Sequence, residues 1–394
     1  MRQAVKQVLP APRGSFLVFG SPLIGEEEIA EVVATLRSGW IGTGPRVAKF
    51  EEMMKDYTGA AQAIAVNSCT AALHLSLLAL GIGRGDEVIT TPMTFVATAN
   101  AIVHAGAKPV FADVNRNTLL IEPEMIERAI TRKTKAVIPV HLAGRVCAMD
   151  EILSLARKHG LHVIEDAAHC IEGRYEGRRA GNIGELTCFS FYVTKNITTG
   201  EGGMVATSNP EWASRIRILS LHGMDQDAHK RFSETGYKHY EVAEPGYKYN
   251  MTDIQAALGI HQLKRIESTW LRRNQVWNYY QENLSDLPVH LPAPDERNTR
   301  HARHLFTIQV YENECGKTRD QVLDSLTRQK IGCGVHYTPV HLHPYYRHTF
   351  GYREGAFPNA EWIGKGTLSL PLSAKLSDED VEDVVAAVRH ALEK

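Results

Sequence analysis

Short apolar runs alternate with helical patterns in the first half of the chain, and this alternation constrains the fold more than any other feature. The β-rich runs cover residues 62–66, 86–90, 109–114, 136–141, 161–165, 186–191 and 203–207. Helical patterns separate most of them, for example over residues 70–80, 95–104, 122–130 and 150–159. Nearly continuous apolar strands that alternate with helices predict an α/β fold, in which helices cover both faces of a mostly parallel sheet.

The pattern changes after Tyr249 and predicts a second domain. Residues 252–284 form a long helical region, and the polar, proline-containing residues 286–300 predict a loop. Strand patterns at residues 305–310 and 334–337, with a closing helix at 378–392, predict a smaller α+β unit. A chain of 394 residues is also long for one core. We therefore expect an N-terminal arm over residues 1–18, a large domain over 19–265 and a small C-terminal domain over 266–394.

Charge and hydropathy argue against several classes of protein. The formal net charge is −1 and no basic face stands out, which argues against a nucleic-acid partner. No apolar stretch is long enough to cross a bilayer, and the start of the chain lacks the apolar segment of a secretory signal. The six cysteines include no CxxC pair, which is typical of reduced thiols. We expect a cytoplasmic protein without a membrane partner.

Lys195 is the first candidate for chemistry because it follows a strand pattern in SFYVTKN, residues 190–196. Asp166 ends an earlier strand pattern, LHVIED, residues 161–166. Ligands of parallel sheets bind outside the carboxyl ends of the strands, where Asp166 is expected. A lysine can hold pyridoxal phosphate as a Schiff base, and a carboxylate can keep its ring nitrogen protonated. A lysine near a strand end is usually only a solvated charge, so this interpretation depends on its surroundings.

The sequence NSCTAA, residues 67–72, joins a predicted strand to a helix and offers an anion site. Backbone N–H groups at a helix N-terminus suit a phosphate, while a plain N-cap is the alternative. The nucleotide signatures GxxxxGK and GxGxxG after a strand are absent, which favours a monoester phosphate. Ser190 is a further candidate phosphate contact. Phe95 is a candidate for stacking on a planar ring, although core packing is the ordinary role of a phenylalanine.

The histidine-rich sequence HYTPVHLH, residues 336–343, does not predict a metal site. No carboxylate or cysteine completes a convincing ligand set, so we favour a substrate-contacting or structural loop and expect no metal. The motifs GxSxG and HExxH are absent, which argues against the corresponding hydrolases.

Five motifs occur in a characteristic order: TAALH (70–74), TPMTF (91–95), EDAAH (165–169), SF through KN (190–196) and GYKYNM (246–251). With them the chain resembles the DegT/DnrJ/EryC1/StrS family of sugar aminotransferases, which have the fold-type-I aspartate aminotransferase architecture. The likeness extends from FGSP (19–22) and SGWIGTGP (38–45) to HLHPYY (341–346) and SLP (369–371). It therefore covers nearly the whole chain and implies a large domain around a mostly parallel sheet, followed by a smaller α+β domain.

The resemblance implies roles around the cofactor pyridoxal 5′-phosphate. Lys195 is expected to form the Schiff base and to shuttle protons, and Asp166 to be the partner of the pyridine nitrogen. His169 is expected near the phenolic oxygen of the cofactor. The other implied contacts are the stacking ring of Phe95 and the phosphate ligands Thr70, Ala71 (through its N–H) and Ser190.

The resemblance also implies partners. Asn250 is expected to reach the phosphate in the neighbouring subunit's site, which implies a homodimer with shared active sites. L-glutamate is the expected donor, leaving pyridoxamine 5′-phosphate, and a nucleotide-linked keto sugar for polysaccharide or glycan biosynthesis is the expected acceptor. Likeness over residues 192–203 and 246–250 favours amination at C4, with C3 as an alternative. Candidate substrate contacts, each with packing or turn formation as the alternative, are Trp40, Gly42, Thr43, His336, His341 and Tyr345.

Two other functions stay open. One is a pyridoxal-phosphate-dependent lyase or sugar dehydratase. Relatives that dehydrate sugars have histidine at the lysine position, so Lys195 favours transamination. The other is a non-catalytic regulatory protein that binds the cofactor, against which the joint presence of Lys195, Asp166 and Ser190 argues.

Overall fold

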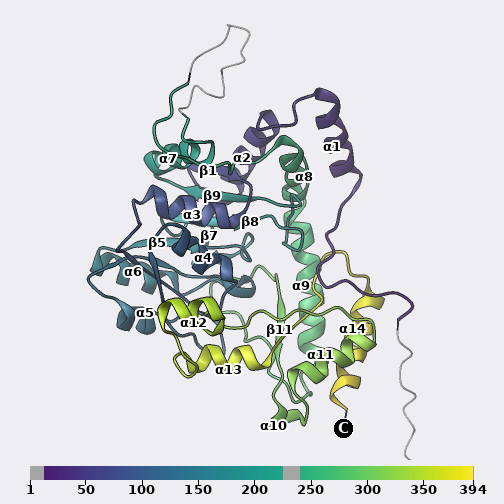
Figure 1. Cartoon of the computed structure of the whole chain (residues 1–394). Coiled ribbons are helices and arrows are strands. Elements are labelled where there is room, and N and C mark those ends of the chain that lie inside the picture. The colour runs from purple at the N-terminus through teal and green to yellow at the C-terminus, as the bar shows by residue number, and fades with distance from the viewer. Residues whose placement is uncertain (1–12, 225–239, 394) are drawn as a thin grey trace, which may run out of the picture.

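The computed structural model describes residues 13–224 and 240–393, and a seven-stranded sheet lies at its centre (Figure 1). The strand order is β1-β9-β8-β5-β4-β2-β3. The strands are β1 (Gln62–Val66), β2 (Glu87–Thr90), β3 (Lys108–Phe111), β4 (Thr134–Ile138), β5 (His162–Asp166), β8 (Leu186–Ser190) and β9 (Gly203–Thr207). Each corresponds to a run predicted from the sequence, with at most small displacements of its ends.

The sheet is mostly parallel, as predicted. All neighbouring pairs from β8 to β3 are parallel, whereas β9 is antiparallel to both β8 and β1. The register places Asp166 opposite Cys188 and pairs Ser190 with Gly203. The carboxyl ends of β5 and β8 therefore meet at one edge of the sheet, where ligands of such sheets bind.

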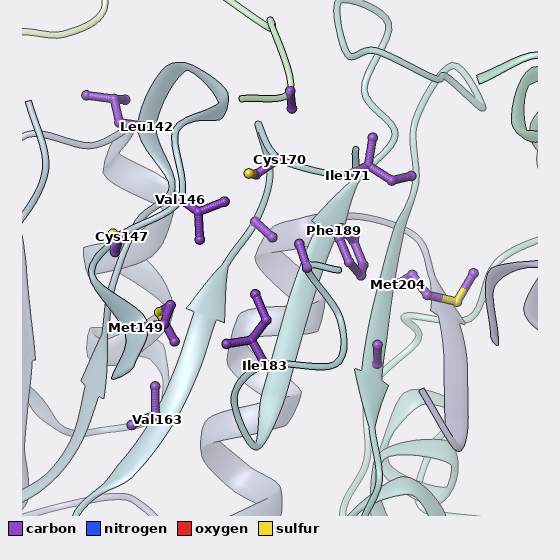
Figure 2. Close-up of a cluster of buried hydrophobic side chains, with 14 of the residues drawn as sticks. Leu142, Val146, Cys147, Met149, Val163, Cys170, Ile171, Ile183, Phe189 and Met204 are labelled. Carbon is purple, nitrogen blue, oxygen red and sulfur yellow. The ribbon is translucent and has the colours of Figure 1, made fainter. Parts of the chain in front are cut away.

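Helices cover both faces because both alternating sets of strand side chains are apolar. On one face, strand residues such as Ile138 and Ile164 pack with α3 (Cys69–Ala79), α4 (Val96–His104) and α7 (Pro210–Ser220). On the other face, Val163, Phe189 and Met204 belong to a cluster that is drawn in Figure 2. That cluster includes side chains of α2 (Pro45–Thr58), α5 (Pro123–Ala129), α6 (Met149–His159) and α8 (Asp253–Lys264).

Side-chain caps define several helix starts. The Ser68 hydroxyl caps α3, and Thr252 forms a capping box with Gln255 at α8. Another capping box begins α14 (Asp378–Leu392), the closing helix predicted from the sequence. The single helical region predicted over residues 252–284 is instead two helices, α8 and α9 (Ile266–Asn283). The chain departs from helical geometry at Arg265, where φ is −104° and ψ is 10°.

A second core lies in the C-terminal part of the chain. Later turns of α9 pack with α11 (Arg319–Arg328), α14 and the antiparallel pair β11 (Phe306–Gln309) and β12 (Thr367–Leu370). The first residue of α9, Ile266, belongs to the larger core, so this helix joins the two. The domain boundaries remain predictions, and residues 1–12 of the predicted N-terminal arm lie outside the described residues. The other elements of this part are α10 (Glu312–Cys315), η3 (Val340–Leu342), α12 (Pro344–Phe350) and α13 (Pro358–Gly366). In Figure 1, α10, α11 and α13 lie at the opposite end of the molecule from α2 and α7.

The strand predicted at residues 334–337 is wrong. Gly334 makes one isolated bridge with Ser369, and β11 pairs with β12 instead. His336 is held mainly by side chains, because its Nδ1 lies 2.9 Å from the Ser369 hydroxyl and its carbonyl accepts a hydrogen bond from the Thr367 hydroxyl.

The remaining elements are short, apart from one helix. The loop predicted over residues 286–300 ends in β10 (Thr299–Arg300), which pairs with β6 (Arg174–Tyr175); β6 in turn pairs with β7 (Arg178–Arg179). A 3-10 turn, η1 (Leu142–Gly144), follows β4, and α1 (Glu26–Ser38) precedes α2.

No helix within residues 13–224 and 240–393 has both the length and the apolar composition needed to cross a bilayer. No group of three or more His, Cys, Asp and Glu side chains in these residues is arranged to hold a metal ion. All six cysteines are free thiols.

Candidate active site

A pocket of about 190 Å³ lies at the carboxyl edge of the sheet. Its wall comes from the starts of α3 and α4 and from the loops that follow β5 and β8, while the C-terminal part of the chain contributes one tyrosine. The topology thus brings together residues that are far apart in sequence. The lining includes Ser68, Thr70, Phe95, Thr98, Asp166, His169, Ser190, Lys195 and Tyr337.

Asp166 is a buried carboxylate at the end of β5, with 5% of its surface exposed. Its Oδ2 accepts a hydrogen bond from the Thr98 hydroxyl at 2.8 Å, and its Oδ1 accepts one from the Ala168 N–H at 3.1 Å. Burial raises the pKa of this carboxyl, although the two hydrogen bonds and nearby Lys195 oppose the shift. No cation among the described residues lies within ion-pair distance of the carboxylate. The site therefore lacks the positive partner that a buried carboxylate requires.

Lys195 lies in the loop between β8 and β9 and lines the same pocket. Burial lowers the pKa of its amine to about 8, against the opposing effects of Cys69 and Asp166. A fraction of the amine is therefore uncharged near neutral pH, as nucleophilic attack on a carbonyl requires.

Hydroxyl groups gather where α3 begins. Thr70 and Ser190 line the pocket, and the Thr70 hydroxyl makes no hydrogen bond within the described residues. The Ala71 N–H, predicted to bind phosphate, donates to the Ser68 hydroxyl at 3.1 Å, and Ala71 does not line the pocket. Ser68 therefore caps the helix, as in the plain N-cap weighed from the sequence, while Thr70 and Ser190 face the pocket and the anion site stays a prediction.

Aromatic side chains also line the site. Phe95 precedes α4 and is 57% exposed, so its ring is not part of a core. Its ring centroid lies 5.8 Å from that of Tyr337. The Tyr337 hydroxyl lies 3.3 Å from Nε2 of His169, whose Nδ1 accepts a hydrogen bond from the Ala143 N–H at 3.2 Å. Burial, followed by the charge of Lys195, keeps the pKa of His169 well below its usual value.

The residue after the lysine, Asn196, is fixed by a buried polar network. Its Nδ2 donates to Glu172 at 2.7 Å and to the Ala302 carbonyl at 2.9 Å, and its Oδ1 lies 2.9 Å from Nδ1 of His304. Glu172 also forms an ion pair with Arg273, and both side chains are buried. The Lys195 loop is therefore tied to α9 and to the segment before β11.

A second group of predicted residues lies in a separate hollow of about 360 Å³, lined by Trp40, Thr43 and Asn250 among others. Nδ2 of Asn250 donates to the Thr43 hydroxyl at 2.6 Å, while its buried Oδ1 has no partner within the described residues. The carbonyl of Gly42 accepts a hydrogen bond from the Asp253 N–H at 2.7 Å. Within one chain this group is not part of the Lys195 pocket.

The three substrate candidates from the C-terminal part occupy different environments. His336 is next to Tyr337, and burial lowers its pKa to about 4. His341 is fully buried, and its Nε2 lies 2.9 Å from Glu361. Tyr345 is 50% exposed on α12. His341 and Tyr345 do not line the pocket. Tyr337 does, yet sequence reasoning did not select it, because only its position beside His336 in HYTPVHLH pointed to it.

The pocket residues fit pyridoxal phosphate, which carries a ring nitrogen that can be protonated, an aldehyde and a phosphate. Asp166 supplies a buried carboxylate without a cation, Lys195 an amine of lowered pKa, and Thr70 a free hydroxyl at a helix N-terminus. The donor set matches all three parts of the molecule.

The model of the DegT/DnrJ/EryC1/StrS aminotransferase family matches residues 22–389. The chain belongs to this family. The family, the fold class and the enzyme class predicted from the sequence are thereby confirmed, and the enzyme is an aminotransferase.

Relatives of this aminotransferase match over nearly their whole length. It is 52% identical over 378 residues to the spore coat polysaccharide biosynthesis protein SpsC of Bacillus subtilis, covering 96% of this chain and 97% of SpsC. The PMP-form structure of the putative sugar aminotransferase Spr1654 of Streptococcus pneumoniae matches with a TM-score of 0.88 and 35% identity, covering 95% and 97% of the two chains. The PLP-form structure of Spr1654 matches with a TM-score of 0.88 and 34% identity, covering 96% and 100%. PseC of Helicobacter pylori, an aminotransferase involved in pseudoaminic acid biosynthesis, matches with a TM-score of 0.88 and 29% identity, covering 96% and 99%.

Proposed function

We propose that this aminotransferase transfers an amino group from L-glutamate to C4 of a nucleotide-linked keto sugar, for polysaccharide or glycan biosynthesis. One observation carries the proposal. Lys195 and Asp166 line one pocket, the lysine with a lowered pKa and the buried aspartate without a cation. This arrangement suits a cofactor that joins an amine and protonates at its ring nitrogen.

Pyridoxal phosphate is the cofactor, as predicted. The aminotransferase family and the PLP-form and PMP-form structures of Spr1654 confirm it. When bound, the cofactor supplies an electron-withdrawing ring that stabilises negative charge on the reacting carbon.

The residues of this chain hold the cofactor and move the proton. The Asp166 carboxylate would keep a proton on the ring nitrogen, and the Phe95 ring would pack against the cofactor. Thr70 and Ser190 would hold the phosphate. With the cofactor bound, the Lys195 amine would act as the base and acid that moves a proton from the donor's Cα to the neighbouring carbon. His169, which lines the same pocket, would lie near the phenolic oxygen.

The names of the relatives support a sugar acceptor. Spr1654 is described as a putative sugar aminotransferase, SpsC takes part in spore coat polysaccharide biosynthesis, and PseC in pseudoaminic acid biosynthesis. The preference for C4 over C3 rests on the likeness of residues 192–203 and 246–250 to enzymes that aminate C4. Lys195, where dehydratases of the family carry histidine, favours transamination over dehydration.

A homodimer with shared active sites is part of the proposal. Asn250, Trp40 and Thr43 line a hollow separate from the Lys195 pocket, as residues that serve a neighbouring subunit's site would. We place the enzyme in the cytoplasm, where nucleotide-linked sugars are made. Of the substrate candidates, His336 lies beside the pocket residue Tyr337. His341 is buried and its Nε2 lies 2.9 Å from Glu361, so we assign it a structural role.

The test offers glutamate and a panel of nucleotide-linked 4-keto and 3-keto sugars to the purified enzyme. We expect 2-oxoglutarate and a 4-amino sugar from the wild type, and neither from Lys195→Ala. A 3-amino product would move the reaction to C3. Near wild-type turnover by Lys195→Ala would overturn the assignment of the lysine, and elimination of water without amination would favour a dehydratase.

A further inference from the structure

Tyr337 brings a hydroxyl group from the C-terminal part of the chain into the pocket. It precedes η3, and its ring lies near the rings of Phe95 and His169. Its ring centroid lies 5.8 Å from that of Phe95 and 6.3 Å from that of His169, nearly parallel to the latter at 28°. Tyr337 therefore lies directly against residues that surround the reacting groups.

The hydrogen bonds of His169 determine which way the Tyr337 proton points. The Ala143 N–H donates to Nδ1 of His169, so Nδ1 presents a lone pair and carries no proton. Burial and the Lys195 charge lower the pKa of His169, which keeps its ring neutral. In a neutral ring without a proton on Nδ1, Nε2 carries the proton. His169 therefore donates to the Tyr337 hydroxyl at 3.3 Å, and the tyrosine oxygen is the acceptor.

The Tyr337 proton is then left without an acceptor. Among the described residues, the His169 contact is the one hydrogen bond of this hydroxyl, and the side chain lines the pocket. Burial, followed by the Asp166 charge, raises the pKa of the phenol, so the proton stays in place at neutral pH. A partly buried O–H group that faces the pocket without an acceptor is free to donate to a molecule bound there.

We propose that the Tyr337 hydroxyl donates a hydrogen bond to an oxygen atom of the molecules bound over Lys195, with His169 fixing its direction. Two oxygen atoms could accept this hydrogen bond. They are the phenolic oxygen of the cofactor and the carbonyl oxygen of the acceptor sugar. The second source rests on the proposed function, whereas the first needs only the cofactor.

The experiment compares Tyr337→Phe with the wild type and with Tyr346→Phe. Tyr346 is a matched control, because its hydroxyl donates to Asn100 at 2.6 Å and does not line the pocket. Three quantities are measured on the cofactor-loaded enzymes. They are the pH titration of the bound cofactor's absorbance, the single-turnover rate with glutamate, and the single-turnover rate of the aminated form with a nucleotide-linked 4-keto sugar. Melting temperatures show whether each variant is folded.

If the absorbance titration shifts in Tyr337→Phe but not in Tyr346→Phe, the Tyr337 hydroxyl donates to the phenolic oxygen of the cofactor. An unchanged titration with a roughly tenfold slower sugar reaction assigns it to the acceptor, since one lost hydrogen bond is worth about that factor. If Tyr337→Phe and Tyr346→Phe give the same values for all three quantities, the proposal is overturned. If the wild type itself aminates no keto sugar, the proposed function fails, and the titration alone decides the role of Tyr337.

Discussion

Asp166 accepts a hydrogen bond from Thr98 at 2.8 Å but has no cation within ion-pair distance among the described residues. A buried carboxylate without a counter-charge destabilises the protein until a positive group binds beside it. The cofactor-free enzyme is therefore strained at the position where the protonated ring nitrogen binds.

Replacing Asp166 by Asn tests this relationship without an activity assay. Burial raises the folded-state pKa of the carboxyl, so the stability of the cofactor-free protein falls as pH rises through that pKa. We expect cofactor-free Asp166→Asn to melt at a higher temperature than the wild type at pH 7 to 8. We also expect it to bind cofactor but to lose about 100-fold or more in turnover, because a neutral amide does not hold the ring proton. Unchanged turnover would remove this role from Asp166.

The lowered pKa of Lys195 predicts that the rate of cofactor attachment depends on pH. Burial lowers its pKa to about 8, and only the uncharged amine attacks the aldehyde. The rate of attachment to cofactor-free enzyme should rise with pH and level off above about pH 8. Stopped-flow absorbance at a series of pH values measures it. A rate that keeps rising to pH 10 would show that the pKa of Lys195 is not lowered.

The ion pair of Glu172 and Arg273 is expected to hold the Lys195 loop in place. Glu172→Gln leaves the buried Arg273 charge without a counter-charge, which costs about 3–5 kcal/mol of unfolding free energy. Denaturant unfolding measures the loss. The exposed pair of Lys158 and Glu127 offers a control, because Glu127→Gln should leave stability unchanged. Equal effects of the two substitutions would contradict the expectation.

Shared active sites predict that two inactive variants restore activity when mixed. A subunit with Lys195→Ala still presents Asn250, and a subunit with Asn250→Ala still presents Lys195. Each mixed dimer would contain one complete site, so random exchange of subunits should recover about one quarter of wild-type turnover. Turnover measured after joint refolding tests this, with each variant refolded alone as control. No recovery, although mixed dimers form, would place Asn250 in its own subunit's site.

The central sheet could be predicted from the sequence because its strands are short apolar runs buried on both faces. Runs such as residues 62–66 and 203–207 coincide with β1 and β9. Strand ends, helix starts and family likeness also point to six site residues from the sequence. All six line the pocket: Lys195, Asp166, Phe95, Thr70, Ser190 and His169.

Contacts between distant segments could not be predicted. Tyr337 reaches the pocket only because the C-terminal part packs over the sheet edge, and Glu172 and Arg273 meet across 101 positions of sequence. The break at Arg265 was missed because helical propensity continues through it. The strand predicted at residues 334–337 failed because the side chains of Ser369 and Thr367 satisfy His336 in place of a ladder.

The antiparallel pairing of β8 and β9 has a consequence for how the enzyme can vary. Both ends of the loop over residues 191–202 are held side by side, by the pairing of Ser190 with Gly203 and by the Phe191 N–H, which donates to the Gly202 carbonyl at 2.9 Å. Because both ends are fixed, a residue inserted in this loop would change the path of the chain between them and move Lys195 relative to Asp166. Turns at the other edge of the sheet can change length without that effect, so homologues and engineered variants should differ there while the lysine loop keeps a constant length.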